Sequence, residues 1–301
     1  MRNAVRIVLI LVVALLVGAG GLYLYSPPKG LDVLNSLYPG DRGVVRVASG
    51  VRFKPGPRGR LDVWALPRTD QRRPVLVFFY GGGWAKGARE EYGFVAKAYA
   101  ARGFVVVVPD YRLVPEVRFP SFLEDAAAAV RWTQDNIARH GGDPSRVVLA
   151  GHSAGAYLAV MLALNPRYLT DAGAKPDVVR AAAGLAGPYD FYPFDKKRSI
   201  DAMARAPDPL ATQPITFARA DAPPLWLATG SADTTVRPRN AVRLAARQRK
   251  LGSRTTELRI YEGGSHNDLI MAVSKPFRDK APVLDESIAF FERALTAQAR
   301  P

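Results

Sequence analysis

Six largely apolar runs constrain most strongly what this chain can fold into. They are four to eight residues long and lie at 75–80, 104–109, 147–150, 179–186, 225–229 and 257–261. Strands of a parallel sheet read as such runs because helices cover both of their faces, whereas half-exposed strands alternate apolar and polar residues. Helical patterns separate most of the runs. We therefore predict a doubly wound, mostly parallel α/β sheet with helices on both faces.

The residues before and between these runs complete the predicted architecture. Residues 44–53 alternate basic and apolar side chains, and 60–66 form a second candidate strand beyond a Pro- and Gly-rich turn, which indicates an antiparallel N-terminal hairpin. Residues 189–222 are rich in Pro, Asp and aromatic residues without a clean period, so we expect a small lid insertion there. We expect helices at 89–102, 122–139, 154–164, 240–251 and 282–299. Residues 31–301 therefore read as one α/β domain.

The first thirty residues form a separate segment. No charged residue lies between Arg6 and Lys29, and the run 7–25 is close to the roughly 20 apolar residues that cross a bilayer as a helix. We therefore predict that residues 1–30 are a membrane anchor or a signal segment, ending in a Pro-rich spacer at 26–30. In both cases the following domain is expected to be exported. It would be tethered outside the cytoplasm by an anchor, or secreted or periplasmic after signal cleavage.

Composition excludes several classes of function. The absence of cysteine removes disulfide scaffolds, thiolate metal sites and cysteine nucleophiles. The 42 Lys and Arg outnumber the 27 Asp and Glu, giving a formal net charge of +15, but the bases are scattered and no DNA- or RNA-binding signature is present. A basic protein that binds nucleic acid or a membrane surface is thus the weaker alternative. We expect no nucleic-acid partner, and contact with an anionic membrane surface only as a secondary property.

The sequence G-H-S-A-G at 151–155 provides a candidate nucleophile, Ser153. An apolar run precedes it and a helical pattern follows, which is the strand–turn–helix setting of a nucleophile elbow. Glycines flank the serine because the turn is too tight for side chains, and the start of the helix offers N–H groups to a developing anion. The alternative is a glycine-rich loop with an ordinary serine.

A catalytic serine needs a base, and the chain offers only three histidines. His140 lies at the end of a predicted helix, where histidine is mostly a capping residue. His152 adjoins the serine within the elbow, so its side chain must diverge from that of the serine. His266 follows the run 257–261, at the strand ends where sites of open parallel sheets lie. We therefore predict that His266 is the base.

The third member should be a carboxylate that follows another strand, between the serine and the histidine in chain order. Asp233 follows the run 225–229 and meets this requirement. Asp190 also follows a strand and is the nearest rival. Asp221 precedes its strand, and Asp268 is too close to the histidine along the chain. We predict that Asp233 holds the imidazole in the correct tautomer.

Three consecutive glycines follow the run 75–80, in the sequence Y-G-G-G-W at 80–84. Glycines allow backbone N–H groups to face a site, and the N–H groups of Gly82, Gly83 and Ala154 are predicted to form an oxyanion hole. A phosphate-binding loop is the alternative, but no Gly-Lys-Ser/Thr follows. The candidate substrate-binding residues are Trp84, His152 and Tyr189. No residue pattern indicates a metal site or a cofactor.

Together these residues resemble the α/β-hydrolase family, and more narrowly its carboxylesterases of the hormone-sensitive-lipase-like and deacetylase/feruloyl-esterase-like branches. The likeness spans about residues 44–295 and is carried by 80–84, 109–120, 151–155, 230–236 and 263–266. It implies structural roles for Asp110, Tyr111, Arg112 and Asp125. Two positions depart from the family pattern. Tyr80 replaces the usual histidine of the glycine loop, and His152 stands where many lipase-like relatives have aspartate.

The resemblance implies a serine hydrolase that cleaves small carboxylic esters through an acyl-enzyme. Arylformamidases and some peptidases are similar in scaffold, so formamide or amide substrates are the alternative within the enzyme class. The resemblance implies no cofactor, and the sequence leaves the oligomeric state and the acyl-chain preference open.

Overall fold

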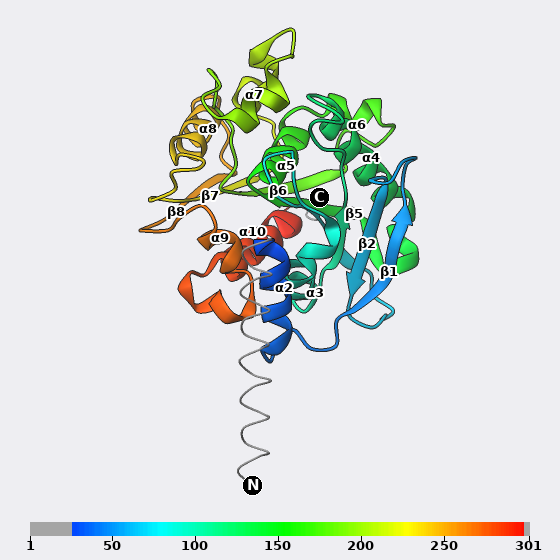
Figure 1. Cartoon of the computed structure of the whole chain (residues 1–301). Helices are drawn as coiled ribbons and strands as arrows, with labels where there is room; N and C mark the ends of the chain where they lie inside the picture. The colour runs from blue at the N-terminus through cyan, green and yellow to red at the C-terminus, as the bar shows by residue number, and fades with distance from the viewer. Residues whose placement is uncertain (1–25, 298–301) are drawn as a thin grey trace.

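An eight-stranded sheet forms the centre of the protein, as seen in a computed structural model that describes residues 26–297 (Figure 1). The strand order is β1-β2-β4-β3-β5-β6-β7-β8. β1 and β2 form an antiparallel hairpin, β2 pairs antiparallel with β4, and all later neighbours are parallel. The strands are β1 (Val45–Arg52), β2 (Arg60–Ala65), β3 (Arg73–Phe79), β4 (Val105–Pro109), β5 (Gly142–His152), β6 (Val179–Leu185), β7 (Leu225–Gly230) and β8 (Thr256–Tyr261). The predicted architecture is confirmed.

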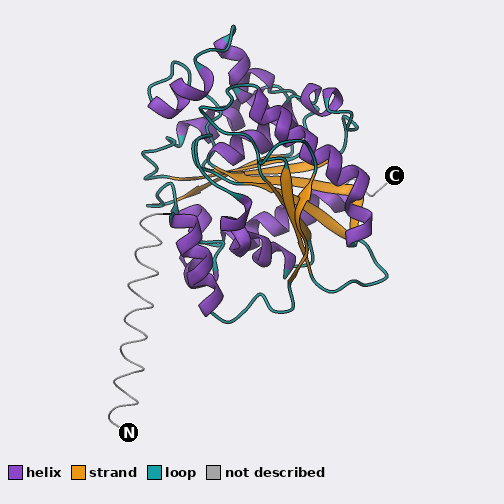
Figure 2. Ribbon diagram, turned by 45° about the vertical axis from the view of Figure 1, so that its right-hand side comes forward, coloured by secondary structure: helices purple, strands orange, loops and turns teal. Residues whose placement is uncertain are grey.

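Helices cover both faces of this sheet (Figure 2). α3 and α10 pack together on one face, where the Tyr99 and Ser287 hydroxyls are 2.7 Å apart, and α4, α5 and α8 lie on the other. The central strands are consequently buried, with every residue from Val75 to Phe79 at most 1% exposed. The helices are α2 (Pro27–Leu37), α3 (Gly93–Ala100), α4 (Ser121–Asn136), α5 (Ala154–Leu164), α6 (Arg167–Asp171), α7 (Lys197–Met203), α8 (Arg239–Lys250), α9 (Asp268–Met271) and α10 (Val283–Ala297).

The structure differs from the sequence-based expectation at residues 26–30, which begin a helix rather than a spacer. Two prolines occupy the first turn of α2, where proline is favoured because its missing N–H has no helical partner. The helix packs on the domain: Ser26 Oγ donates to Glu91, Leu31 is buried, and Asn35 accepts the backbone N–H of Lys275. Contacts distant in sequence therefore decide the conformation of this segment.

The predicted anchor or signal run at 7–25 lies outside the described residues. Within residues 26–297, the structure contains no helix with the length and apolar character needed to cross a bilayer.

The segment at 189–222, expected as a lid, contains α7 and two short 3₁₀ helices, η3 (Pro209–Thr212) and η4 (Pro214–Phe217). Buried amide side chains help to fix its conformation: Gln213 Oε1 accepts the backbone N–H groups of Phe191 and Tyr192, at 2.7 and 3.1 Å, and Asn240 Oδ1 accepts those of Tyr189 and Asp190. Such a fold has no hydrophobic period, because it depends on polar contacts between residues distant in sequence.

A buried carboxylate, that of Asp125, links the turn of the N-terminal hairpin to α4 and to the segment after β4. Asp125 on α4 is fully buried and accepts hydrogen bonds from the backbone N–H, Nε and Nη2 of Arg112, and an ion pair from Lys54. Burial by itself raises the pKa of Asp125, but the hydrogen bonds from Arg112 and Lys54 outweigh it and hold the pKa below its usual value. Asp125 therefore connects the β1–β2 turn, the end of β4 and α4.

We expect Asp125→Asn to lower the free energy of unfolding by about 2–4 kcal/mol, because it leaves two cations with a weakened buried partner. Asp135→Asn on the same helix is the matched control. Asp135 pairs with Arg131 at the exposed i,i+4 spacing, and such a pair contributes about 0.3–0.5 kcal/mol. Urea unfolding of the two variants measures the difference, and equal losses would contradict the structural role of Asp125.

Candidate active site

The turn between β5 and α5 holds Ser153 in an unusual conformation. Its φ of 55° and ψ of −119° lie outside the regions that non-glycine residues favour. The flanking glycines make the turn feasible. A Cβ atom on Gly155 would lie 1.9 Å from the carbonyl oxygen of Phe79, and one on Gly151 would lie 2.3 Å from the backbone of Gly155. Only glycine fits at these two positions.

Ser153, His266 and Asp233 form a continuous hydrogen-bonded chain. The distance from Ser153 Oγ to His266 Nε2 is 2.9 Å, and His266 Nδ1 lies 2.8 Å from Asp233 Oδ2. The other oxygen of Asp233 accepts the backbone N–H groups of Thr235 and Val236, at 2.9 and 2.8 Å. The Asp233 side chain is fully buried and that of His266 is 13% exposed. The carboxylate is therefore fixed in place and oriented toward the imidazole.

These three residues meet because each follows a strand of the parallel part of the sheet. Ser153 follows β5, Asp233 follows β7 and His266 follows β8, so all three lie at the same edge. The rival residues have other partners. Asp190 accepts an ion pair from Arg243 at 2.8 Å, and the ring of His140 stacks on that of Trp132.

His152 lies beside His266 in the site. The two ring centroids are 4.9 Å apart, and His152 Nε2 is 3.0 Å from the carbonyl oxygen of His266. Burial, and secondarily the proximity of His266, lowers the pKa of His152 to about 3. The side chain is therefore neutral at physiological pH. In the Nε2–H tautomer it donates a hydrogen bond to the backbone that carries His266.

The glycine loop after β3 lies against the elbow. A Cβ atom on Gly81 would lie 3.0 Å from the carbonyl oxygen of His152, and Gly82 and Gly83 have φ values of 120° and 61°. Trp84 follows with its ring packed against Tyr157 at a centroid distance of 5.4 Å. The loop and the turn that carries Ser153 are thus in direct contact.

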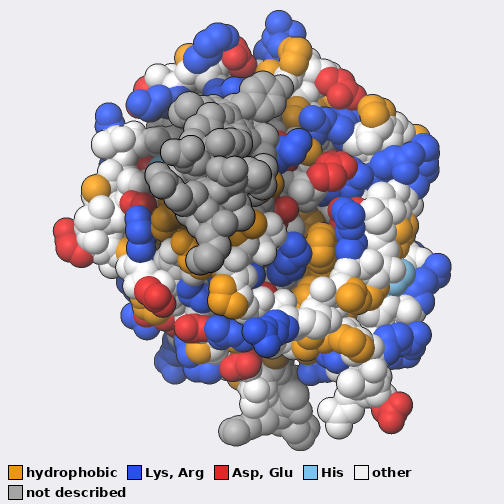
Figure 3. Space-filling view, turned by 60° about the horizontal axis from the view of Figure 1, so that its bottom comes forward, with side chains coloured by type: hydrophobic (Ala, Val, Ile, Leu, Met, Phe, Trp, Pro, Cys, Tyr) orange, Lys and Arg blue, Asp and Glu red, His pale blue; other side chains and the backbone are white. Residues whose placement is uncertain are grey.

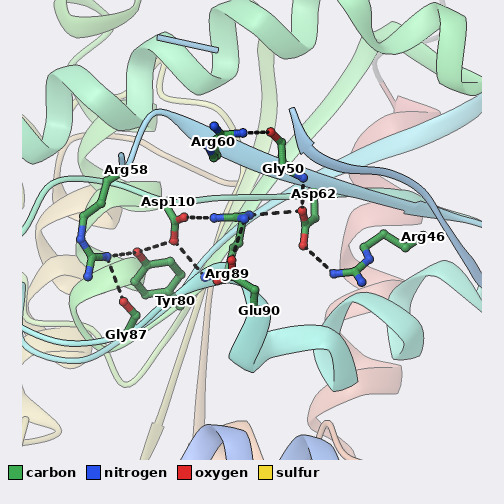
Figure 4. Close-up of polar contacts among 10 residues, drawn as sticks. All are labelled: Arg46, Gly50, Arg58, Arg60, Asp62, Tyr80, Gly87, Arg89, Glu90 and Asp110. Carbon is green, nitrogen blue, oxygen red and sulfur yellow. Dashed lines mark hydrogen bonds and ion pairs between the residues drawn. The ribbon is translucent and has the colours of Figure 1, made fainter. Parts of the chain in front are cut away.

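A buried polar network braces the start of this loop (Figure 4). Tyr80 Oη donates to Asp110 at 3.0 Å and accepts from Arg58, which also donates to the carbonyl of Gly87. Arg89 pairs with Asp110 and with Asp62. Burial and the neighbouring Tyr111 and Asp110 raise the pKa of Tyr80, so its hydroxyl stays protonated and can donate. Tyr80 thus connects the loop to the β1–β2 turn through Arg58 and to the end of β4 through Asp110.

Arg58, Asp62 and Arg89 were not predicted from the sequence to belong to this network. One signal was available: Asp62 stands in the otherwise apolar run 61–66, and a buried charge requires a partner. Which residues pair with Asp62 depends on how the hairpin packs, and the sequence pattern does not contain that information.

A cavity of about 1160 Å³ opens over Ser153. It is lined by Gly82, Gly83, Ala154 and His266, and by two of the three predicted substrate-binding residues, Trp84 and His152. The third, Tyr189, is fully buried and does not line the cavity. Its hydroxyl packs where Gly184 and Gly187 lack side chains.

Within residues 26–297 no group of three or more His, Asp and Glu side chains is arranged to hold a metal ion.

Comparison with curated proteins finds several esterases. Carboxylesterase NlhH of Mycobacterium tuberculosis is 42% identical over 115 residues, which cover 38% of this chain and 35% of that protein. Esterase LipC of the same organism is 30% identical over 205 residues, or 62% of this chain and 51% of that protein. The chain spans 35% to 58% of the length of the first eight curated relatives that it matches.

Solved structures and a family model agree with these relatives. Esterase 2 of Thermogutta terrifontis, in its apo form, is 25% identical with a TM-score of 0.68, covering 85% of this chain and 96% of that one. The BD-FAE family model matches residues 61–247, more than half of the chain, and these residues include the glycine loop, Ser153 and Asp233. The chain therefore belongs to the BD-FAE family, within the carboxylesterase-related α/β-hydrolases.

Proposed function

We propose that this protein hydrolyses carboxylic esters with Ser153 as nucleophile, His266 as base and Asp233 as the carboxylate that orients His266. The observation that carries the proposal is the unbroken hydrogen-bonded chain from Ser153 Oγ through both ring nitrogens of His266 to Asp233, at 2.9 and 2.8 Å. The esterase names of the relatives support it. This arrangement is the one that activates a serine hydroxyl at neutral pH.

In the first half of the reaction, Ser153 Oγ attacks the ester carbonyl carbon while His266 Nε2 takes the hydroxyl proton. Asp233 stabilises the resulting imidazolium through Nδ1. The negative charge moves to the carbonyl oxygen, where the backbone N–H groups of Gly82, Gly83 and Ala154 hold it. Collapse of this intermediate breaks the bond to the alcohol oxygen, which takes the proton from His266, and leaves an acyl-Ser153 ester.

The second half repeats these steps with water as the nucleophile. His266 removes a proton from water, and the hydroxide adds to the acyl carbon with the same N–H groups stabilising the charge. Collapse then breaks the bond to Ser153 Oγ, which recovers its proton from His266. The acid leaves and the free enzyme is restored.

We propose that the substrates are small esters. The cavity is comparable in volume to the pockets of about 300–1,000 Å³ that hold small ligands. Trp84 supplies an apolar wall beside the glycine loop, and His152 forms part of the floor next to Ser153. Tyr189 does not contact the substrate in this proposal, because its side chain is fully buried and does not line the cavity.

Placement outside the cytoplasm remains a prediction from the sequence. It rests on the uncharged run at 7–25 and is independent of the chemistry proposed for the domain.

Replacing Ser153 with alanine is expected to lower kcat for 4-nitrophenyl butyrate by about 10⁴–10⁶, because the acyl-enzyme can no longer form. Ser145→Ala is the control, since Ser145 is an exposed serine on the same strand, β5. Release of 4-nitrophenolate measures both rates. A Ser153→Ala variant with unchanged turnover would exclude the mechanism, and hydrolysis of 4-nitroacetanilide but not of the ester would favour amide substrates.

The low pKa of His152 leads us to expect that the free energy of unfolding depends on pH. Its pKa is about 3 in the folded protein, against about 6.5 in an unfolded chain, so between these values the unfolded state binds more protons. Stability therefore falls as the pH drops below about 6.5. From pH 7.5 to pH 5, the wild type should lose about 2 kcal/mol more than a His152→Asn variant does.

Urea unfolding at the two pH values measures this difference. His140→Asn is the matched control, since His140 is only partly buried and a smaller difference is expected. Parallel stability curves for the wild type and His152→Asn would show that His152 is not held neutral by the fold.

A further inference from the structure

The cavity over Ser153 has a strongly cationic border. Among the described residues, its lining contains two carboxylates, Glu91 and Asp195. Against these stand six basic side chains, which we call the cationic rim: Lys86, Lys196, Lys197, Arg198, Arg237 and Arg239. A cleft lined by one sign of charge concentrates its electrostatic field and raises the local concentration of oppositely charged ligands.

Arg198 brings this charge to the glycine loop. It belongs to the first turn of α7, and its Nη1 donates to the carbonyl oxygen of Gly82 at 3.2 Å. A Cβ atom on Gly83 would lie 2.5 Å from its Cδ, so the side chain rests directly on the loop. A guanidinium has five N–H donors, and this contact uses one. The remaining donors belong to a side chain that lines the cavity.

Most of the rim has no carboxylate to neutralise it. Lys197 pairs with Asp201 on its own helix, and Glu91 accepts a hydrogen bond from Ser26. Among the described residues, no ion pair joins a carboxylate to any of the other five rim cations. By contrast, the partly buried Arg89 and Arg112 are paired with buried aspartates. The rim charge therefore faces solvent and incoming ligand.

Apolar side chains line another part of the cavity. They are Pro27 and Leu31 of α2, Ile270 and Met271, and they lie alongside the hydrogen-bonded Ser26 and Glu91 in the cavity lining. The site thus combines an apolar part of its lining with a cationic rim beside the glycine loop. A ligand with an apolar body and one negatively charged end complements both.

We infer that the preferred substrates are esters carrying a carboxylate a few carbon atoms from the scissile carbonyl, and that Arg198 is the main residue that binds this carboxylate. The inference rests on the proposed esterase function and names its substrate class. A guanidinium suits this role because its paired N–H donors match the two oxygens of a carboxylate. The carboxylate can lie on the acyl side or on the alcohol side of the ester.

General basicity of the protein is the competing explanation for any preference. The chain carries a formal net charge of +15, and Figure 3 shows Lys and Arg side chains spread over one face among acidic and hydrophobic ones. Such a distribution attracts any anion weakly and without regard to the site. The test must therefore separate a local contact at Arg198 from overall charge.

Two matched substrate pairs measure the preference in the full chain. 4-Nitrophenyl hexanoate and mono-4-nitrophenyl adipate differ by a carboxylate on the acyl side; methyl 4-acetoxybenzoate and 4-acetoxybenzoate differ by one on the alcohol side. After division by the uncatalysed rates, we expect kcat/KM to favour the anionic member of at least one pair by about tenfold, mainly through KM. The preference should shrink in 0.5 M NaCl, because salt screens exposed charges.

Arg198→Gln should reduce this preference by about fivefold. Arg249→Gln makes the same change of charge on an exposed part of α8 that does not line the cavity, and should change the preference by less than twofold. Equal effects of the two substitutions would show that only net charge matters and overturn the inference.

Lack of preference in both pairs would also overturn the inference, and if hydrolysis still required Ser153 the proposed esterase function would stand. Failure to hydrolyse any of the four esters would overturn the proposed function and this inference with it.

Discussion

The close approach of α5 to β3 is the contact on which the arrangement of the site depends. Gly155 lies against the carbonyl of Phe79, and Gly81 lies against the backbone and side chain of the elbow. Because β3 and β5 are neighbours in the sheet, these contacts bring the glycine loop and Ser153 together without any intervening side chain. The backbone thus sets the relative position of Ser153 and the proposed oxyanion donors. Substitutions near this contact are compatible with the fold only where they leave the close backbone packing at the glycines intact.

Buried aspartates use some of the many Lys and Arg side chains of this protein to stabilise the structure around the site. Asp62, Asp110 and Asp125 each receive arginine or lysine partners, so several cations of the chain serve the interior. Asp233 is equally buried but differs in its partners, which are two backbone N–H groups and His266. With no permanent cation beside it, this carboxylate remains available to stabilise an imidazolium. The partners of each acid therefore separate structural carboxylates from the one proposed to act in catalysis.

The sequence predicted those features that depend on local pattern. The run 225–229 became β7, and Ser153 could be identified because an apolar strand and a helix flank its glycines. Features that depend on distant contacts could not be predicted. Residues 26–30 form a helix rather than a spacer because Ser26 reaches Glu91, 65 positions away. Tyr189 follows a strand as expected, but small residues at Gly184 and Gly187 leave room for its ring beneath the strand ends, so it turns away from the cavity.

The positions of the residues that would select a substrate could not be predicted from the sequence either, because they depend on distant contacts. Residues 189–222 have no period because the buried amides of Gln213 and Asn240, together with scattered apolar contacts, hold the segment in place. That fold places α7 above the glycine loop, and only then does Arg198 lie beside the proposed oxyanion site. The proposed catalytic residues and the proposed substrate-binding residue therefore have different structural origins in this protein. The proposed reacting groups follow from the sheet, whose strands can be recognised from sequence. The cation proposed to bind the substrate instead lies in an irregular segment, whose shape depends on contacts between residues distant in sequence.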